Sequence, residues 1–219
     1  MKIIKPSAVI EYPYDMIDVA SIYHRIESAG RTCYISKRDV TDFDRTRKFI
    51  RKLIESGHEA VIEHASMTVR FTVDRGVSHE IVRHRVASFA QESTRYCNYS
   101  KDKFGNELTF IDPCFWEKDS EMYKKWTAMM RTAEVVYMEM ISNGAKPEEA
   151  RTVLPNSLKT ELVMTADIRE WRHFFKLRAA GTTGKPHPQM VEVALPLLEE
   201  CKRIMPELFD DIEVKTWTL

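Results

Sequence analysis

The chain lacks the surplus of one charge, the paired cysteines and the long apolar runs that mark several protein classes. Its 219 residues carry 33 Lys and Arg against 33 Asp and Glu, whereas nucleic-acid binders usually show a basic surplus. The four cysteines are scattered without C-x-x-C, so we expect no disulfide framework and no structural zinc site, and reduced thiols favour the cytoplasm. No apolar run approaches a membrane span, and the polar start MKIIKPSAVIEYPYD is not typical of a secretory signal. We therefore expect a cytoplasmic protein that binds neither nucleic acid nor membrane.

Signature motifs of several enzyme classes are also missing. The seven glycines never form G-x-G-x-x-G, which disfavours a Rossmann dinucleotide turn. In GTTGKPH, Pro186 stands where a phosphate-binding loop needs Ser or Thr for magnesium. The pairs His58/His64 and His79/His84 are six and five residues apart, whereas two zinc ligands on one helical face are about four apart. We therefore expect no metal, and without G-x-S-x-G a nucleophilic serine is not indicated.

Hydrophobic periodicity predicts mixed helices and strands without regular βαβ alternation or repeats. We expect strands over residues 3–12, 65–74, 107–112 and 158–167, the first interrupted by Pro6. We expect helices over residues 15–30, 41–57, 75–85, 116–142, 147–151, 168–180 and 188–205. In these predictions Gly30 and Gly57 end the first two helices, Thr41 or Asp42 caps the second, and Pro196 kinks the last. The pattern indicates one α+β domain over residues 1–219, with helices packed on a small antiparallel or mixed sheet.

The segment RHRVASFAQESTRY, residues 83–96, concentrates anion-binding groups in a chain of zero net charge. The groups are Arg83, His84, Arg85, Ser93, Thr94 and Arg95. Guanidinium forks suit phosphate, and hydroxyls add neutral donors. We expect a loop over residues 93–95 to wrap one phosphate group. The alternative is a solvated basic patch with hydroxyls that cap a helix.

The segment IREWRHFFKLR places an arginine at the end of an apolar stripe. Ile168, Trp171, Phe175 and Arg178 share one helical face. We expect three further cationic side chains on the opposite face: Arg169, Arg172 and His173. A buried arginine is costly unless it meets an anion. Arg178 is therefore either a cation in a pocket wall, aimed at a ligand, or the partner of a core carboxylate, or it reaches the surface.

Two smaller groups of polar residues can be explained by ordinary structural contacts. Arg151, between KPEEA and TVLP, is by itself expected in a surface ion pair. His58, Glu63 and His64 cluster before a strand. Helix capping and a buried His–Glu hydrogen bond would account for this cluster.

Several segments together resemble one enzyme family. RHRVASFAQESTRY resembles the signature of the flavin-dependent thymidylate synthases, an Arg-His-Arg followed by seven residues and a serine. AGRTCY, GHEAVIEHASMTVRF, EEARTVLP, DIREWRHFFKLR and HPQM resemble the family's other blocks, in the same order. These blocks run from about residue 29 to residue 190, which is nearly the whole chain.

The resemblance implies a homotetrameric α+β enzyme whose active sites lie at subunit interfaces. Such an enzyme converts dUMP to dTMP. Methylenetetrahydrofolate supplies the carbon, bound FAD carries the hydride, and NADPH reduces the flavin again. The family needs neither a Rossmann turn for FAD nor a catalytic cysteine.

The resemblance also implies roles for individual residues. Those expected to bind dUMP are Glu80, Arg83, Gln91, Ser93, Thr94, Arg95, Arg178 and, from another subunit, Arg151. Those expected around the flavin and folate are His58, Ala60, Glu63, Arg83, His84, Arg85, Gln91, Asp167, Arg169, His173 and His187. Arg178 is the expected catalytic residue, lying against the uracil ring and stabilising charge as the N3–H is lost or polarised. Ala60 replaces a frequent Ser or Thr, and Asp167 replaces a common Asn.

Two other functions remain open from the sequence. A related flavoenzyme could methylate or reduce a different pyrimidine nucleotide. An RNA-binding module could use the basic patches together with exposed aromatic residues such as Phe89 and Tyr96.

Overall fold

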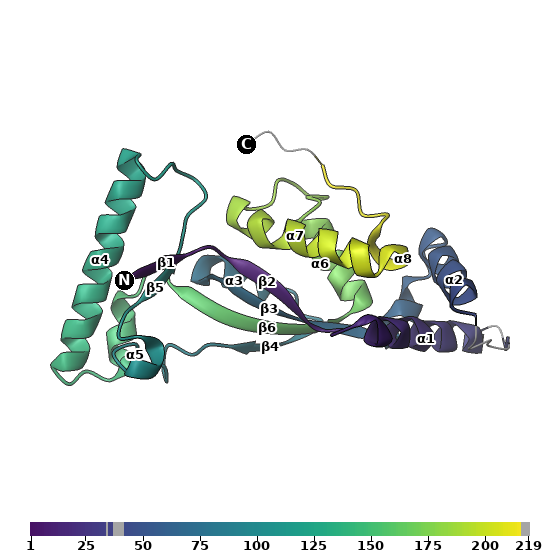
Figure 1. Ribbon diagram of the computed structural model, residues 1–219, viewed down its shortest axis with the longest axis horizontal. Helices are drawn as coiled ribbons and strands as arrows, with labels where there is room; N and C mark the ends of the chain where they lie inside the picture. Colours follow the sequence, from purple (N-terminus) through teal and green to yellow (C-terminus); the bar gives the residue numbers. More distant parts are fainter. Residues whose placement is uncertain (34, 37–41, 216–219) are drawn as a thin grey trace. The chain divides into compact units, whose positions relative to one another are not determined.

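The structure, a computed structural model, describes residues 1–33, 35–36 and 42–215. The strands are β1 (Lys2–Ile4), β2 (Ser7–Tyr12), β3 (Ser66–Asp74), β4 (Ala87–Gln91), β5 (Thr109–Ile111) and β6 (Lys159–Asp167). The α-helices are α1 (Met16–Cys33), α2 (Phe43–Glu55), α3 (Arg75–Ile81), α4 (Glu121–Ser142), α5 (Pro147–Ala150), α6 (Ile168–Arg178), α7 (Pro188–Ile204) and α8 (Pro206–Phe209). Short 3-10 helices are η1 (Glu59–His64), η2 (Asp102–Phe104) and η3 (Arg151–Val153). The mixture of helices and strands confirms the α+β class (Figure 1).

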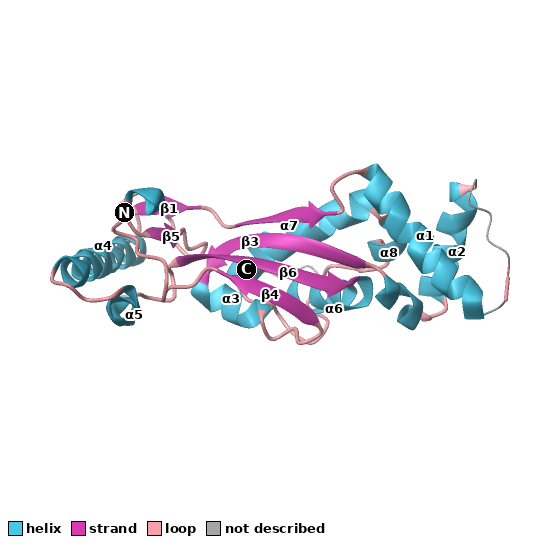
Figure 2. Cartoon of the chain, turned by 90° about the horizontal axis from the view of Figure 1, so that it is seen from below, coloured by secondary structure: helices cyan, strands magenta, loops and turns pink. Residues whose placement is uncertain are grey.

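The strands form two sheets, which Figure 2 shows in magenta. β1 pairs in parallel with β5, and the larger sheet has the order β2-β3-β6-β4. A hydroxyl contact joins Thr68 to Thr165 at 2.9 Å, and the Arg75 N–H donates to the Asn156 carbonyl at 2.9 Å. These contacts make β3 and β6 antiparallel. Buried residues alternate along both strands, which is the period-two pattern that predicted them.

The chain divides into two compact units that are interleaved in sequence. Unit 1 comprises Met1–Ser7, Thr72–Arg83 and Ala90–Leu162, and unit 2 comprises Ala8–Phe71, His84–Phe89 and Val163–Leu219. The chain crosses between units within β2, β3, β4 and β6, and between Arg83 and His84. A single domain over residues 1–219 stays a prediction. In the part of the chain that the structure describes, no helix combines the length and the apolar composition needed to cross a bilayer.

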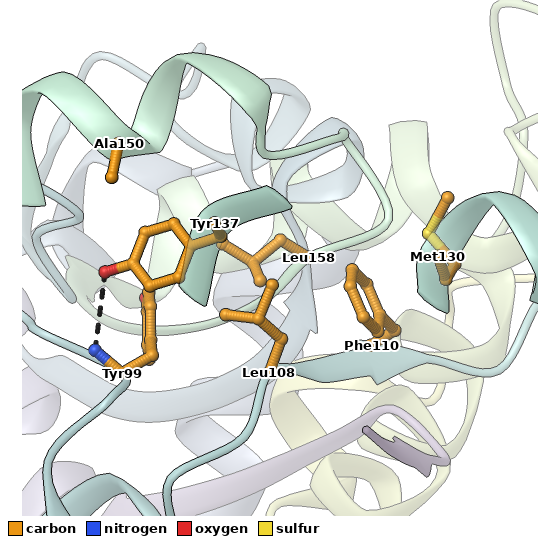
Figure 3. Packing of buried hydrophobic residues seen from close by; sticks show 7 residues of the cluster. All are labelled: Tyr99, Leu108, Phe110, Met130, Tyr137, Ala150 and Leu158. Atoms are coloured by element: carbon orange, nitrogen blue, oxygen red, sulfur yellow. Dashed lines mark hydrogen bonds between the residues drawn. The ribbon is translucent and has the colours of Figure 1, made fainter. Parts of the chain in front are cut away.

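The core of unit 1 lies among α4, α5, β5 and the start of β6. Its buried members, drawn in Figure 3, are Tyr99, Leu108, Phe110, Met130, Tyr137, Ala150 and Leu158. The Tyr137 hydroxyl accepts the N–H of Tyr99 at 3.4 Å, so the phenol is buried with a hydrogen-bond partner. The chain's first amino group forms ion pairs with Glu107 and Glu134, which hold β1 beside this core.

The core of unit 2 is built on the aromatic face of α6. Trp171, Phe174 and Phe175 are fully buried. The Phe71 ring of β3 stacks on Trp171 at 6.3 Å between ring centroids. The indole N–H of Trp171 donates to the carbonyl of Met67 at 2.9 Å. These contacts fix the rotation of α6 and therefore the direction of its remaining side chains.

Gly30 does not end the first helix, contrary to the prediction. α1 continues through it to Cys33. A Cβ at Gly30 would lie 2.9 Å from Cε1 of Phe49, so glycine is needed there for the close approach of α2.

The predicted ends of the second helix are confirmed where the structure describes them. The Asp42 carboxylate accepts the Arg45 N–H at 2.9 Å and caps α2. The alternative cap, Thr41, lies outside the described residues. Gly57 has a φ of 69°, a left-handed conformation that suits glycine after a helix.

Other element bounds differ from the predictions. α3 ends at Ile81 instead of continuing to residue 85, and residues 87–91 form β4, which was not predicted. α4 begins only at Glu121, because the Ser120 hydroxyl accepts the Tyr123 N–H and caps the helix there. The short α8 was not predicted either.

Candidate functional site

His84 is the buried centre of a hydrogen-bonded chain in unit 2. It lies between α3 and β4, and its side chain is only 2% exposed. Its Nδ1 lies 2.8 Å from Oε1 of Glu170, and its Nε2 lies 3.2 Å from Nε of Arg178. A guanidinium is always protonated and has no acceptor. Arg178 therefore donates to Nε2, which places the imidazole proton on Nδ1, where it donates to Glu170.

The surroundings of His84 favour its neutral form. Burial lowers the pKa of His84 below its ordinary value, and the charges of Arg178 and His173 act in the same direction. The hydrogen bond to Glu170 opposes them. The rings of Phe174 and His173 lie 5.1 and 5.6 Å from the imidazole, centroid to centroid. A neutral imidazole can accept a hydrogen bond from Arg178, whereas an imidazolium cannot.

His84, Glu170 and His173 resemble a set of metal ligands, with candidate ligand atoms within 4.8 Å of one another. Both ring nitrogens of His84 are already in hydrogen bonds, however. The Arg178 charge beside Nε2 also repels a cation. The donor set therefore suits hydrogen bonding better than metal binding.

A hollow of about 400 Å³ lies beside this chain of contacts. Its lining comprises Glu59, Glu63, Val86, Asp167, Arg169, Glu170, His173 and Lys176. Four of the residues expected around the flavin meet here: Glu63, Asp167, Arg169 and His173. The hollow thus offers carboxylate acceptors and cationic donors within one cavity.

Asp167 has a structural role in addition to its place in the lining. Its Oδ1 accepts the N–H of Glu170 at 2.8 Å and caps α6. Burial raises the pKa of Asp167, the charges of Glu63 and Glu170 raise it further, and the capping bond opposes them. Asn and Asp both cap helices well, so the departure from Asn preserves the start of α6.

Arg172, predicted on the face of α6 opposite the apolar stripe, is buried. Its side chain is 2% exposed, and its two terminal nitrogens bond to the Asp211 carboxylate at 2.7 and 2.6 Å. It also donates to the Leu208 carbonyl and, at 3.1 Å, to Glu59. Arg172, for which no carboxylate partner was predicted, therefore meets the partly exposed carboxylate of Asp211. Arg169 is exposed as expected and pairs with Glu63 at 2.5 Å.

The cluster before β3 contains no buried His–Glu bond. His58, Glu63 and His64 are all exposed, and the side chain of His58 makes no capping bond at η1. The buried His–Glu pair of unit 2 is His84 with Glu170 instead. Three other residues expected around the flavin are also exposed: Ala60, Arg85 and His187.

Unit 1 holds the residues expected to bind the nucleotide, apart from Arg178. The Gln91 amide donates to Ser78 Oγ at 2.9 Å and to Thr160 Oγ1 at 3.3 Å. The Ser93 hydroxyl accepts the Arg95 N–H at 3.3 Å, within a turn closed by the bond from Cys97 N–H to the Ser93 carbonyl. Thr94, which lies within this turn, is buried.

Arg95 is exposed and is held by a surface contact. Its Nε donates to Glu148 of α5 at 2.9 Å, and its guanidinium lies 5.3 Å from the Tyr96 ring centroid. Arg151, three residues after Glu148, is also exposed, and it makes no ion pair within residues 1–33, 35–36 and 42–215. The surface ion pair expected for Arg151 is therefore absent from this part of the chain. Two further residues expected to bind dUMP lie on or just after α3. Glu80 is half-buried on the helix, and Arg83, two residues after its end, is exposed.

Sequence reasoning missed Glu170, Glu59 and Lys176. Asp167 and Glu170 form the Asp-x-x-Glu spacing that is typical of a helix start. That spacing accounts for Glu170 as part of a helix start, and it does not indicate the contact of Glu170 with His84, which is 86 residues away in the sequence. Glu59 and Lys176 carry no motif, and only their place in the lining of the hollow identifies them.

Comparisons with known proteins identify the family of the chain. A family model described as thymidylate synthase complementing protein matches residues 16–207. The flavin-dependent thymidylate synthase of Pyrococcus furiosus is 36% identical over 169 residues, which cover 76% of this chain and 64% of that protein. The same-named protein of Mycobacterium sp. strain JLS is 31% identical over 210 residues, covering 86% and 79%. The chain thus spans less than two thirds of the Pyrococcus relative.

A solved structure shows that the fold is shared. It is the crystal structure of a UMP/dUMP methylase, PolB, from Streptomyces cacaoi bound with 5-Br dUMP. The TM-score is 0.72 at 22% identity, with 96% of each chain covered. With the match over residues 16–207, these similarities show that the chain belongs to the thymidylate synthase complementing protein family, that of the flavin-dependent thymidylate synthases.

Proposed function

We propose that the chain catalyses the reductive methylation of dUMP to dTMP. Methylenetetrahydrofolate is the carbon donor, NADPH the reductant and FAD the bound cofactor, in a cytoplasmic homotetramer with active sites at subunit interfaces. Because the chain belongs to this family, one structural observation is enough to carry the proposal. The Arg178 guanidinium is oriented by a buried, neutral His84 next to a hollow that contains four of the residues expected around a flavin.

The hollow in unit 2 fits a flavin in its chemistry. A dinucleotide cofactor needs cationic donors for its phosphates and acceptors for its ring N–H and hydroxyl groups. Arg169, Lys176 and His173 supply the donors, and Glu63 and Asp167 supply the acceptors. When bound, FAD supplies the hydride. Arg85, exposed two residues before β4, adds a further cation for the phosphates of FAD.

Arg178 has the proposed catalytic role. Its guanidinium lies against the uracil ring and stabilises the negative charge that develops as the N3–H is lost or polarised. A cation that is already oriented stabilises such charge without reorganisation during the reaction. The bond from Nε to His84 provides this orientation.

The exposed groups of unit 1 have the proposed role of binding the nucleotide phosphate. Arg95 and Arg151 supply charge, and Ser93 and Thr94 lie in the turn beside Arg95. A phosphate dianion competes with Glu148 for the Arg95 guanidinium, because charge-assisted bonds to phosphate are bidentate and strong. Gln91, held by Ser78 and Thr160, has its carbonyl oxygen directed to the nucleotide in this proposal.

An assay with dUMP, methylenetetrahydrofolate and NADPH, with and without added FAD, tests the proposal directly. We expect dTMP to form only when all components are present. We also expect purified protein loaded with FAD to be yellow and to bleach with NADPH. Protein that takes up no flavin and forms no dTMP would refute the proposal.

A related flavoenzyme acting on another pyrimidine nucleotide is a second candidate. The PolB structure, which shares the fold, is described as a UMP/dUMP methylase. Running the same assay with UMP in place of dUMP separates the candidates, and faster turnover of UMP would favour the second. An RNA-binding module would instead show affinity for RNA that falls steeply with salt and is insensitive to dUMP.

A further inference from the structure

We propose that Glu170 is a positioning residue for Arg178 and that it acts through His84. The inference rests on the catalytic role proposed for Arg178 and adds to it the groups that hold this side chain. Glu170 precedes Arg178 by eight residues on α6, a rise of about 12 Å along the helix. The contact between them runs through the imidazole of His84, which bonds to both side chains.

The direction of each bond follows from the chemistry of the donors. Arg178 can only donate, so His84 Nε2 must accept. The single proton of the neutral ring is then on Nδ1, and the Glu170 carboxylate accepts it. Without an acceptor at position 170, the proton is free to move to Nε2. There it would face the N–H of Arg178, and two donors repel each other.

The charge of Glu170 has an effect separate from its acceptor oxygen. The groups that act on the pKa of His84 are Glu170, His173 and Arg178, all on α6. Burial, Arg178 and His173 lower this pKa, and Glu170 raises it. Removing only the charge should leave the ring neutral and its tautomer intact. Removing the oxygen as well should release the tautomer.

Burial makes the arrangement rigid. The side chains of His84 and Glu170 are 2% and 11% exposed, so water can replace neither bond easily. Phe174 packs at 5.1 Å from the imidazole ring, and the Asp167 cap fixes the turn from which Glu170 extends. These contacts hold in place the imidazole nitrogen to which Arg178 Nε donates. Positioning of this kind matters because a misplacement of about 1 Å can reduce the rate about hundredfold.

Two substitutions separate the acceptor from the charge. Glu170→Gln keeps an oxygen that can accept the Nδ1 proton, whereas Glu170→Ala removes it. Glu199→Gln, on the exposed surface of α7, is the matched control. ¹⁵N-labelled protein without ligands reports the His84 tautomer and the Arg178 Nε–H signal. Assignments come from His84→Gln and Arg178→Lys.

We expect the Nδ1–H tautomer in the unsubstituted protein, in Glu170→Gln and in Glu199→Gln, and its loss in Glu170→Ala. In Glu170→Gln the pKa of His84 should fall further, because the charge that raises it is gone. With saturating FAD, kcat should fall about tenfold to hundredfold in Glu170→Ala, as for other residues that orient a functional side chain. Glu170→Gln should retain most of the unsubstituted kcat. FAD is kept saturating because Glu170 also lines the hollow proposed for the flavin.

The outcomes distinguish this inference from the proposed function. An unchanged tautomer and Arg178 signal in Glu170→Ala would overturn the positioning role, whatever the enzyme turns over. Equal losses of kcat in Glu170→Gln and Glu170→Ala would also overturn it, because the acceptor oxygen would then not matter. Absence of dTMP from the unsubstituted enzyme would overturn the proposed function, and the spectra of the ligand-free protein would still decide the positioning of Arg178.

Discussion

The cationic side chains of the two units are held in different ways. In unit 2, the buried Arg172 side chain bonds to Asp211, and Arg178 bonds to the buried His84, before any ligand binds. In unit 1, Arg95 makes one contact on the surface and Arg151 is exposed. Burial makes orientation permanent, since an unpaired buried charge is costly. Exposure leaves a guanidinium free to change partners when an anion arrives.

The difference suggests a division of roles. Oriented groups are suited to stabilising charge in a transition state. Exposed cations are suited to capturing a phosphate, whose binding then depends on salt. Substitutions of arginines in unit 2 should therefore affect stability or turnover, and those in unit 1 should affect dUMP binding. The effects should decrease from the buried sites to the exposed ones.

Arg172→Ala should have the largest effect, on stability. It leaves the Leu208 carbonyl and the carboxylates of Glu59 and Asp211 without their central partner. Leaving a buried group without its hydrogen-bond partner costs about 1–3 kcal/mol, and the partial exposure of both carboxylates limits the cost of leaving them unpaired. Urea denaturation measures the free energy of unfolding. The control is Arg169→Ala on the same helix, which is exposed and should change stability little.

The same substitution should alter the acid dependence of stability. Burial alone would raise the pKa of Asp211 and of Glu59, but Arg172 outweighs it and holds both below their ordinary values. A lowered folded-state pKa contributes stability above the ordinary carboxyl pKa of about 4, and this contribution is lost as the pH falls through the folded value. Arg172→Ala should flatten that acid-side loss. Identical acid denaturation of the two proteins would contradict the assignment.

Arg178→Ala should have the next largest effect, on turnover. Removing an oriented donor from developing charge costs about 10²–10³ in kcat. FAD binding and the free energy of unfolding should hardly change, and steady-state kinetics with flavin absorbance measure these quantities. Arg178→Lys keeps the charge and loses the Nε bond to His84, so its kcat should lie between those of the unsubstituted protein and Arg178→Ala. Normal turnover of dUMP by Arg178→Ala would exclude the catalytic role.

Arg95→Ala should weaken dUMP binding with little effect on the fold. Loss of a charged hydrogen bond to phosphate costs about 1.5–3 kcal/mol. Calorimetric titration with dUMP at two salt concentrations measures the loss and its salt dependence. The affinity of Arg95→Ala for deoxyuridine, which has no phosphate, provides the control. Unchanged dUMP affinity would remove Arg95 from the phosphate site.

Glu148→Gln should have the smallest effect. The pair of Glu148 with Arg95 is a surface contact, and such pairs contribute up to about 1 kcal/mol. Losing this competitor should leave stability nearly unchanged and strengthen dUMP binding slightly, within a few-fold. Calorimetric titration with dUMP measures this change in affinity. Weaker dUMP binding would indicate that Glu148 orients Arg95 for phosphate instead of competing with it.

Much of the fold follows from local patterns. The period-two alternation in β3 and β6 and the apolar face of α6 predict these elements. The end of α1 was missed because Gly30 serves contact with Phe49, which lies on another helix. β4 was missed because residues 87–91, ASFAQ, form an edge strand of five residues in which Phe89 is the only large apolar side chain.

The site was predicted in part. The sequence alone singled out the segment 83–96 and the arginine at the end of the α6 stripe. It could not say that Arg172 meets Asp211 and that Arg178 meets His84, because these partners are distant from α6 in sequence. The roles assigned by resemblance stay predictions for the substrate and flavin residues.

By itself the sequence determined which groups are available: its periodicity sets the helices and strands, and its motifs place the cations. Only the tertiary structure decided what each cation contacts. Asp211 is brought to Arg172, and His84 to Arg178, by packing of segments far apart in the chain. The physical reason is that burial cost and hydrogen-bond direction depend on neighbours in space, which spacing along the chain does not specify.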